Sequence, residues 1–376
     1  MNDSSTADSP TAHTPTADSA ALAQLHPAER AALQQLAAGV SRVLVTGAGG
    51  FLGKAICRRL LAAGIRVTGF ARGHYPELSA MGVDMVRGDI ADGAGVQAAL
   101  QAFGRCELVF HVASKAGVWG SRASYFSPNV KGAANVVAAC RALNIPALVY
   151  TSTPSVTFAG KDEAGIDESA PYAARFLNHY AESKALAERL MLGANGSSCA
   201  DGTRLRTVAL RPHLIWGPGD PHLVPRVLAR GRSGRLKLVG REDKLVDTIY
   251  VDNAAHGHIL AALDLCAGAP QSAGKAYFLS NDEPITMAAM LNRILACDGL
   301  APVSQRVPTA LAYGVGALLE GAYRLLGKQQ EPIMTRFVAR QLSTSHYFDI
   351  TAAKRDLGYR PLVSLDEGMA RLKASL

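Results

Sequence analysis

The chain of 376 residues lacks features that mark several common protein classes. It has no C-x-x-C pair, and its six cysteines lie far apart, which argues against a zinc cluster and against a disulfide scaffold. No apolar run reaches the roughly 18–20 uncharged residues that a membrane-spanning helix needs. We therefore predict no metal site, at most peripheral contact with a membrane, and a reducing, cytoplasmic location.

The first twenty residues have neither a basic start nor an apolar core, so they do not resemble a secretory signal. They are mostly Ser, Thr, Ala, Asp and Pro, a composition typical of disorder. We expect residues 1–38 to form a disordered tail followed by a short helix over 21–38, with Pro27 near the start of that helix.

Acidic residues are in the minority, with 31 Asp and Glu against 39 Lys and Arg, and the formal net charge is +8. Such a balance favours an anionic small molecule, nucleic acid or an anionic membrane surface. Seven of the cations lie within 226–244, where one could contact a substrate carboxylate or all could be solvated. Because this run lacks the interleaved aromatic residues of a single-strand groove, we predict no nucleic-acid partner.

Short apolar runs alternate with helix-period segments in the first half of the chain. The runs lie at 43–45, 65–70, 83–86, 107–112 and 147–151. Near-continuous apolar strands separated by helices indicate a parallel sheet covered on both faces, and right-handed crossovers make it doubly wound. The predicted fold class is therefore α/β, a Rossmann-type doubly wound parallel sheet.

The alternation of apolar runs and helix-period segments ends after residue 216. Residues 217–249 are rich in Gly, Pro and Arg, and residues 281–345 look mainly helical and loop-like. We predict a dinucleotide-binding domain over 39–216, to which 250–280 return as a helix and a strand. Residues 217–249 and 281–376 would form most of a smaller, discontinuous substrate or cap domain.

A glycine-rich turn, T-G-A-G-G-F-L-G, joins the first predicted strand to the first helix at residues 46–53. Gly47 permits a tight turn, Gly50 lets the backbone approach a pyrophosphate, and Gly53 lets helix and strand pack closely. Phe51 and Leu52 open the helix whose N-terminal N–H groups would bind the phosphates. The turn predicts a dinucleotide cofactor.

The second predicted strand does not end in the acid that would pair with the ribose 2′-hydroxyl of NAD. Arg72 stands there instead, and the first acid is Glu77. We predict that Arg72 faces the 2′-phosphate of NADP, so that NADPH is preferred to NADH; a solvated surface arginine is the alternative.

Two further strand ends supply candidate cofactor contacts. Asp89 and Ile90 follow the third strand, where the carboxylate could accept the adenine amino group. Ala113 and Ser114 follow the fourth strand, beside the expected nicotinamide half, and His111 before them has the alternative of an ordinary buried histidine.

Candidate groups for proton transfer come next in the chain. Tyr180 and Lys184 are four residues apart, which places phenol and ammonium on one helix face, and the ammonium should lower the pKa of the phenol. Ser152 and Thr153 lie at the end of the fifth strand, where a hydroxyl can donate to a substrate carbonyl. An exposed helix with an incidental pair is the alternative.

These motifs, in this order, resemble the extended short-chain dehydrogenase/reductase family from about residue 42 to the C-terminus. Further shared segments are L-R-P at 210–212, W-G-P-G-D at 216–220 and Y-V-D-N-A at 250–254. Within the family the chain is similar to the 3β-hydroxysteroid dehydrogenase-like branch. The segment T-S-T-P-S-V-T-F-A-G at 151–160 is most similar to the bacterial 2-alkyl-3-oxoalkanoate reductases of long-chain olefin synthesis.

The resemblance implies roles for individual residues. Tyr180 would protonate the carbonyl oxygen, Lys184 would hold the ribose hydroxyls, and Thr153, with Ser152 as second candidate, would be the catalytic hydroxyl. The implied contacts to the nicotinamide are Pro212, His213 and Leu214. The implied reaction is NADPH-dependent reduction of a long-chain 2-alkyl-3-oxoalkanoic acid to the 3-hydroxy acid, in assembly with other olefin-pathway enzymes or as a homo-oligomer.

Other functions remain open at the level of sequence. A sterol or steroid 3β-dehydrogenase using NAD would share the same motifs, and a sugar-nucleotide epimerase or dehydratase fits the broad family. A nucleotide-sensing scaffold without turnover is the non-enzyme alternative, although it would not need Tyr180 and Lys184. The nearly apolar stretch 311–326 could line an acyl tunnel, lie at a membrane, dock a partner or be an ordinary buried helix.

Overall fold

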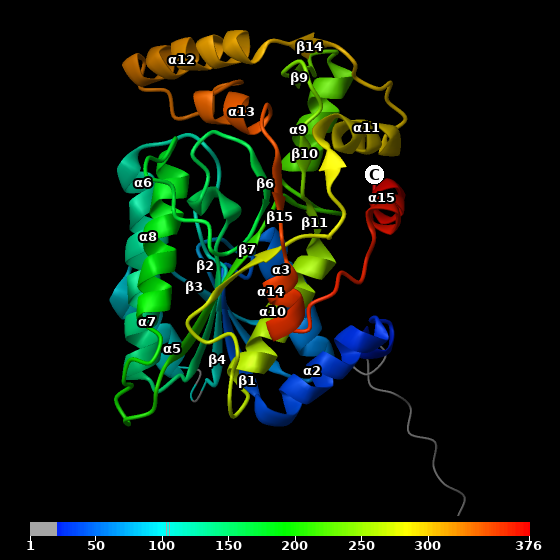
Figure 1. Cartoon of the computed structure of the whole chain (residues 1–376). Helices are drawn as coiled ribbons and strands as arrows, with labels where there is room; N and C mark the ends of the chain where they lie inside the picture. Colours follow the sequence, from blue (N-terminus) through cyan, green and yellow to red (C-terminus); the bar gives the residue numbers. More distant parts are fainter. Residues whose placement is uncertain (1–20, 103, 105) are drawn as a thin grey trace, which may run out of the picture.

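The computed structural model describes residues 21–102, 104 and 106–376 (Figure 1). The predicted disordered tail lies outside the described residues. The short helix predicted after it is α2 (Pro27–Gly39), which begins with proline at its first position and is capped by His26, whose Nδ1 accepts from Ala28 N–H at 3.2 Å.

The centre of the molecule is a seven-stranded sheet in the order β12-β7-β5-β4-β1-β2-β3. All neighbouring strands are parallel. The strands are β1 (Arg42–Thr46), β2 (Arg66–Ala71), β3 (Asp84–Arg87), β4 (Leu108–His111), β5 (Ala147–Thr151), β7 (Arg206–Pro212) and β12 (Ala276–Leu279). The chain therefore has the doubly wound parallel sheet that the sequence predicts.

Alternate side chains of the strands enter two separate cores, one on each face. Val43 and Val45 of β1 pack with the helices α2, α3 and α10, whereas Leu44 between them packs with α5, α7 and α8. Figure 1 shows these two groups of helices on opposite sides of the sheet. The helices of this part are α3 (Phe51–Ala62), α4 (Pro76–Ala80), α5 (Gly93–Ala102), α6 (Arg122–Phe126), α7 (Gly132–Ala142), α8 (His179–Gly193) and α10 (Val251–Leu265), with the π-helical η1 (Ser127–Lys131) and the 3₁₀ turn η2 (Pro154–Val156).

A second, smaller group of elements lies over the carboxyl ends of the strands. Its four-stranded sheet has the order β13-β10-β15-β6, with β13 antiparallel to β10. The remaining elements are β6 (Glu163–Ile166), β8 (Ile215–Trp216), α9 (Leu223–Arg232), β9 (Leu238–Val239), β10 (Leu245–Val246), β11 (Ile249–Tyr250), β13 (Ile285–Thr286), α11 (Met287–Cys297), β14 (Arg306–Val307), α12 (Thr309–Leu325), α13 (Arg336–Gln341), β15 (His346–Phe348), α14 (Thr351–Asp356) and α15 (Leu365–Ala374).

The predicted division into domains stays a prediction, and one strand pairs with a sheet outside its predicted domain. β6 lies within the predicted range 39–216, yet it pairs with β15 in the small sheet. β12, from the segment predicted to return, pairs with β7 in the large sheet.

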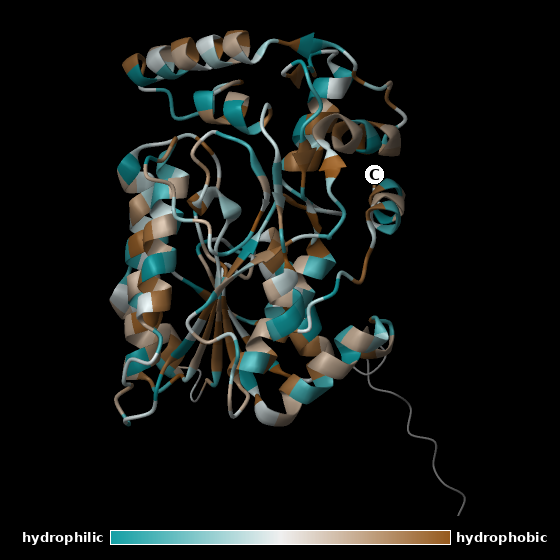
Figure 2. Cartoon of the chain, viewed as in Figure 1, coloured by the Kyte–Doolittle hydropathy of each residue, from teal (hydrophilic) through white to brown (hydrophobic). Residues whose placement is uncertain are grey.

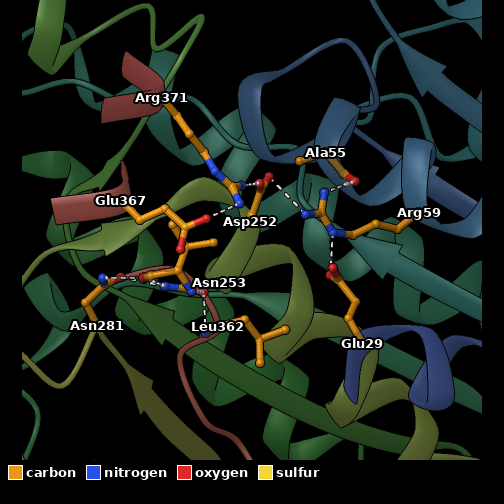
Figure 3. A network of polar contacts seen from close by, with 10 residues as sticks. Glu29, Ala55, Arg59, Asp252, Asn253, Asn281, Leu362, Glu367 and Arg371 are labelled. Carbon is orange, nitrogen blue, oxygen red and sulfur yellow. Dashed lines mark hydrogen bonds and ion pairs between the residues drawn. The ribbon is translucent and has the colours of Figure 1, made fainter. Parts of the chain in front are cut away.

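An ion network that is buried at Glu29 and Arg59 joins helices near both ends of the described chain to α3 and α10 (Figure 3). Arg59 of α3 donates from Nε to Glu29 of α2 at 2.6 Å, and its other guanidinium nitrogen lies 2.9 Å from Asp252 of α10. Asp252 also pairs with Arg371 of α15 at 3.1 Å. The helices α2, α3, α10 and α15 therefore share one set of charges.

Candidate active site

The carboxyl ends of the large sheet's strands and the overlying loops enclose a cavity of about 860 Å³. Ligands bind at this edge in open parallel sheets because several strand ends and helix N-termini meet there. The cavity is lined by the glycine turn, the ends of β2, β4, β5 and β7, helix α8, and part of α13. Among the described residues, no group of three or more His, Cys, Asp or Glu side chains could hold a metal ion.

The glycine turn has the geometry of a phosphate cradle. Gly47 has φ +71°, and a Cβ there would lie 2.8 Å from the backbone of Ala113. A Cβ on Gly53 would lie 2.2 Å from the carbonyl oxygen of Gly47, so only glycine lets α3 pack on the turn. Gly50 caps α3 without a side-chain hydrogen bond, and the next residues, Phe51 and Leu52, line the cavity. The helix N-terminus is therefore available to a pyrophosphate.

Arg72 follows directly after β2. It lines the cavity and is exposed, and its carbonyl oxygen accepts from Arg87 Nε at 3.0 Å. Glu77, the first acid after β2, pairs with Lys54 at 2.7 Å. Lys54 therefore already engages the carboxylate that could otherwise have served a ribose hydroxyl.

The structure does not place Asp89 at the cavity, in contrast to the expectation from the sequence. Its carboxylate accepts from the N–H of Ala91 at 2.9 Å, closing a turn, and the side chain is exposed. Its neighbour Ile90 does line the cavity.

Ala113 and Ser114 line the cavity after β4, and His111 is the last residue of that strand. His111 is buried and shares a 2.8 Å hydrogen bond between Nδ1 and Thr46 Oγ1. Burial, reinforced by the charge of Lys184, lowers the pKa of His111 to about 3. The imidazole is therefore neutral, and its Nε2 is buried with no hydrogen-bond partner among the described residues, so the ring is only partly satisfied.

Helix α8 brings Tyr180 and Lys184 together in the cavity lining. Its N-terminus is fixed by Asn178, whose side chain accepts from Ala181 N–H at 2.8 Å. Lys184 is only 2% exposed, and its Nζ donates to the carbonyl oxygen of Thr151 at 2.5 Å. Burial lowers the pKa of Lys184 to about 7, and the nearby charge of Glu188 opposes this shift.

The pKa of Tyr180 differs from the sequence-based expectation. Burial raises it above its ordinary value, while a hydrogen bond with Thr153 acts in the opposite direction. The ammonium expected to lower this pKa belongs to Lys184 and bonds to Thr151 instead. Tyr180 therefore carries its proton at neutral pH, as a general acid must.

Two hydroxyls follow β5 and line the cavity. Thr153 caps the turn η2 by accepting from the N–H of Ser155 at 3.3 Å, and its side chain forms a hydrogen bond with that of Tyr180. Ser152 is buried, and its hydroxyl has no hydrogen-bond partner within the described protein. A buried, unpartnered hydroxyl at a cavity is available to a ligand.

Pro212, His213 and Leu214 line the cavity after β7, where the resemblance implies a nicotinamide contact. The Nδ1 of His213 lies 2.8 Å from the carbonyl oxygen of Asp247, so Nδ1 carries the proton. Burial lowers the pKa of His213 to about 3. Leu214 has φ +45°, a strained backbone conformation for a leucine.

Some lining and supporting residues have no local signal in the sequence. Lys115 lines the cavity, and its Nζ donates to Ser124 at 2.7 Å. Asn129, within η1, accepts from Lys115 N–H at 2.7 Å and donates to Ser183 of α8 at 2.9 Å. Phe337 and Gln341 reach the cavity from α13. They come from segments far apart in the chain and belong to no common motif.

The basic run at 226–244 does not reach the cavity lining. Arg226 pairs with Glu331, Arg232 with Asp298, and Lys244 with Asp162. Arg230 donates to the carbonyl oxygen of Ile333 at 3.0 Å. These cations join elements of the small group, so the alternative in which one of them contacts a substrate carboxylate gains no support.

Comparisons with known proteins agree with this geometry. The model of the 3-beta hydroxysteroid dehydrogenase/isomerase family matches residues 44–307. A 2-alkyl-3-oxoalkanoate reductase of Shewanella oneidensis is 72% identical over 93% of this chain and 89% of that relative. A second protein of that name, from Stenotrophomonas maltophilia, is 50% identical over 89% of this chain and 99% of its own length.

Solved structures show the same fold. The UDP-glucose 4-epimerase of Thermus thermophilus, in complex with NAD, superposes with a TM-score of 0.66 at 26% identity, covering 89% of this chain and 98% of that one. The family is NAD(P)-dependent, and the expectation of an NAD(P)-dependent oxidoreductase is confirmed. Because the family match covers more than half of the chain and the two reductases align over most of it, the chain belongs to the 3-beta hydroxysteroid dehydrogenase/isomerase family.

Proposed function

We propose that the protein is an NADPH-dependent reductase of long-chain 2-alkyl-3-oxoalkanoic acids, which forms the 2-alkyl-3-hydroxy acid in olefin biosynthesis. The observation that carries the proposal is that Tyr180, Lys184 and the glycine turn line one cavity in a chain 72% identical to a protein of that named activity. The substrate is a small molecule with a ketone next to the carbon that bears its carboxylate.

A bound nicotinamide dinucleotide would supply the hydride for the ketone carbon. The chain's own part is to provide the proton and to stabilise negative charge on the ketone oxygen. Tyr180 donates the proton, and its raised pKa keeps that proton in place until charge develops on the substrate. Thr153 orients the phenol through their hydrogen bond, and the free hydroxyl of Ser152 adds a second donor.

Lys184 would hold the ribose hydroxyls of the cofactor from the same helix face as Tyr180. The residues Gly47, Gly50 and Gly53 would admit the pyrophosphate, and Pro212 to Leu214 would contact the nicotinamide half. Support comes from the cradle that a Cβ at Gly47 or Gly53 would fill and from the uncapped N-terminus of α3.

We infer that NADPH is preferred to NADH through Arg72. A guanidinium makes charge-assisted hydrogen bonds to a phosphate, and Lys54 already neutralises the nearby Glu77. Because Arg72 is exposed and screened by salt, we expect about a ten-fold preference in kcat/KM. Arg72→Ala should remove this preference, whereas Arg66→Ala, an exposed arginine at the other end of β2, should keep it. Equal losses with both cofactors, or a wild type that prefers NADH, would contradict the assignment.

The proposal extends to the location and assembly of the protein. We infer a cytoplasmic location, in keeping with six cysteines that are all free thiols. We also infer assembly with other enzymes of olefin synthesis or with a second copy of the chain; size measurement of the purified protein, alone and mixed with those enzymes, tests this.

A cofactor-oxidation screen tests the function itself. Purified protein is supplied with NADPH and, in separate reactions, a 2-alkyl-3-oxo acid, a 3-ketosteroid and a nucleotide sugar. We expect turnover with the 2-alkyl-3-oxo acid. Turnover with the steroid alone would move the assignment to the steroid dehydrogenases of the same family.

A further inference from the structure

Exposed apolar side chains are concentrated on one helix of the small group. Of the eight large apolar residues that are exposed in the described chain, six lie between 311 and 333. Leu311, Val315, Leu318, Leu325 and Leu326 form a stripe along α12 and its end, here named the α12 face. The spacing of four, three and seven residues puts them on one side of the helix. Figure 2 shows brown turns on α12 at the outer edge of the molecule.

The opposite side of α12 is fixed to the protein. A Cβ on Gly316 would lie 2.6 Å from the backbone of Thr335, so α12 packs closely on the start of α13. Glu320 is buried and accepts from the N–H of Arg336 at 2.7 Å and from its guanidinium at 2.8 Å. These contacts determine which side of α12 faces outward, and the α12 face is that side.

Cations and amphipathic aromatic rings surround the α12 face. Arg324 lies 5.6 Å from the ring of Trp119, and Lys328 lies 5.1 Å from the ring of Tyr323. Trp119 and Tyr323 themselves meet edge to face at 6.2 Å. Tyr and Trp beside Lys and Arg are the side chains found at the boundary between lipid and water.

The charge of this region is complementary to an anionic surface. Residues 309–345 contain four Lys and Arg and two acids. Both acids are engaged, Glu320 with Arg336 and more distantly with Arg324, and Glu331 with Arg226, so two positive charges remain in excess over this segment. The exposed charge next to the α12 face is therefore positive, which favours anionic headgroups.

We propose that the α12 face binds the surface of an anionic lipid bilayer, with its leucines among the acyl chains and its flanking cations at the headgroups. No helix among the described residues has the length and apolarity to cross a membrane, so the contact is peripheral. α13, on which α12 packs, also carries Phe337 and Gln341 into the cavity lining. The surface would thus bring the cavity close to lipid, and its use for delivering a long-chain substrate rests on the proposed function.

Vesicle flotation of the full-length protein tests this. We use vesicles of phosphatidylcholine alone and of phosphatidylcholine and phosphatidylglycerol in equal parts. The wild type should float with the anionic vesicles, and added salt should weaken its binding. Leu318 and Leu325 are 76% and 88% exposed. The double variant Leu318→Gln/Leu325→Gln should bind the anionic vesicles about ten-fold more weakly than the wild type, or weaker still. Leu376→Gln, an exposed leucine outside the α12 face, should bind like the wild type.

Three outcomes would overturn the proposal. These are a wild type that does not float, a loss of binding that is as large for Leu376→Gln, and a wild-type oligomer that only the double variant dissociates. The last result would assign the α12 face to a second copy of the chain. Turnover of a detergent-solubilised long-chain 2-alkyl-3-oxo acid is measured in parallel on the same proteins. If this turnover is absent while flotation occurs, the proposed function fails and the lipid contact stands.

Discussion

Replacing the buried lysine of the site should stabilise the cofactor-free protein while abolishing its activity. Burial lowers the pKa of Lys184 from 10.5 to about 7, so holding the charged form in the folded state is costly. At about 1.4 kcal/mol per tenfold change in proton affinity, this cost is roughly 5 kcal/mol. Lys184→Met removes it but leaves the Thr151 carbonyl oxygen without its donor, at about 1–3 kcal/mol. We expect a net gain of about 2–4 kcal/mol near pH 6.

The gain should depend on pH with a definite sign. Below about pH 7 the folded protein carries the charged lysine at full cost. Between pH 7 and 10.5 the folded lysine is neutral while the lysine of the unfolded chain is still protonated, so the unfolded state binds more protons. Below about pH 7 both states are protonated, and the stability no longer changes with this group. Stability of the wild type therefore rises as pH rises from 7 to 10.5. The variant lacks this titration, so its advantage should shrink and then reverse near pH 10, because the neutral amine of the wild type still donates to Thr151.

Urea unfolding of the two proteins at a series of pH values measures the difference. Lys131→Met, at an exposed lysine, is the matched control and should follow the wild type at every pH. A variant that is less stable than the wild type already near pH 6, or a difference that does not change with pH, would refute the reasoning.

Three further changes follow from the same contacts. Tyr180→Phe should lower kcat by roughly 10²–10⁴-fold and leave the Kd of NADPH nearly unchanged, as read by fluorescence titration; retention of more than about half of the turnover would remove Tyr180 from its role. Thr153→Ala should lower kcat by about 10²-fold, and Thr153→Ser, which keeps the hydroxyl, should restore most of it; equal losses in both would point to packing instead. Arg59→Met should lower the free energy of unfolding by about 3–5 kcal/mol, because it leaves the carboxylates of Glu29 and Asp252 without their buried guanidinium. The more exposed Arg371→Met should lower it by less than about 1 kcal/mol. Equal losses in denaturant unfolding would contradict the network in Figure 3.

The large sheet was predictable because β1, β4 and β5 each contain a continuous apolar run, and β2 and β3 lie between them at helix-length spacing. A strand buried on both faces needs apolar residues at every position, as 43–45 of β1 and 147–149 of β5 show. The small sheet carries no such signal. β10 and β13 have two residues each, and their partners come from distant segments of the chain. Such short strands have no periodicity to detect.

The site was predictable where a motif fixes the local geometry. The glycine turn and the Tyr180 helix have this property, and the structure places both at the cavity. Asp89 and the pKa of Tyr180 were not predictable, because they depend on where a side chain finds its partner. Asp89 closes its own turn, and Lys184 bonds to Thr151 rather than approaching the phenol.

Transfer of deuterium from the cofactor tests the central claim most directly. The protein is incubated with NADPH carrying deuterium on the nicotinamide C4 position, in the epimer that is transferred, and a 2-alkyl-3-oxoalkanoic acid, and the product is analysed by mass spectrometry and NMR. Our account predicts a 2-alkyl-3-hydroxy acid with deuterium bonded to C3, formed by the wild type and nearly absent with Tyr180→Phe. Product without deuterium at C3 from either C4 epimer, or equal labelling with Tyr180→Phe, would contradict it.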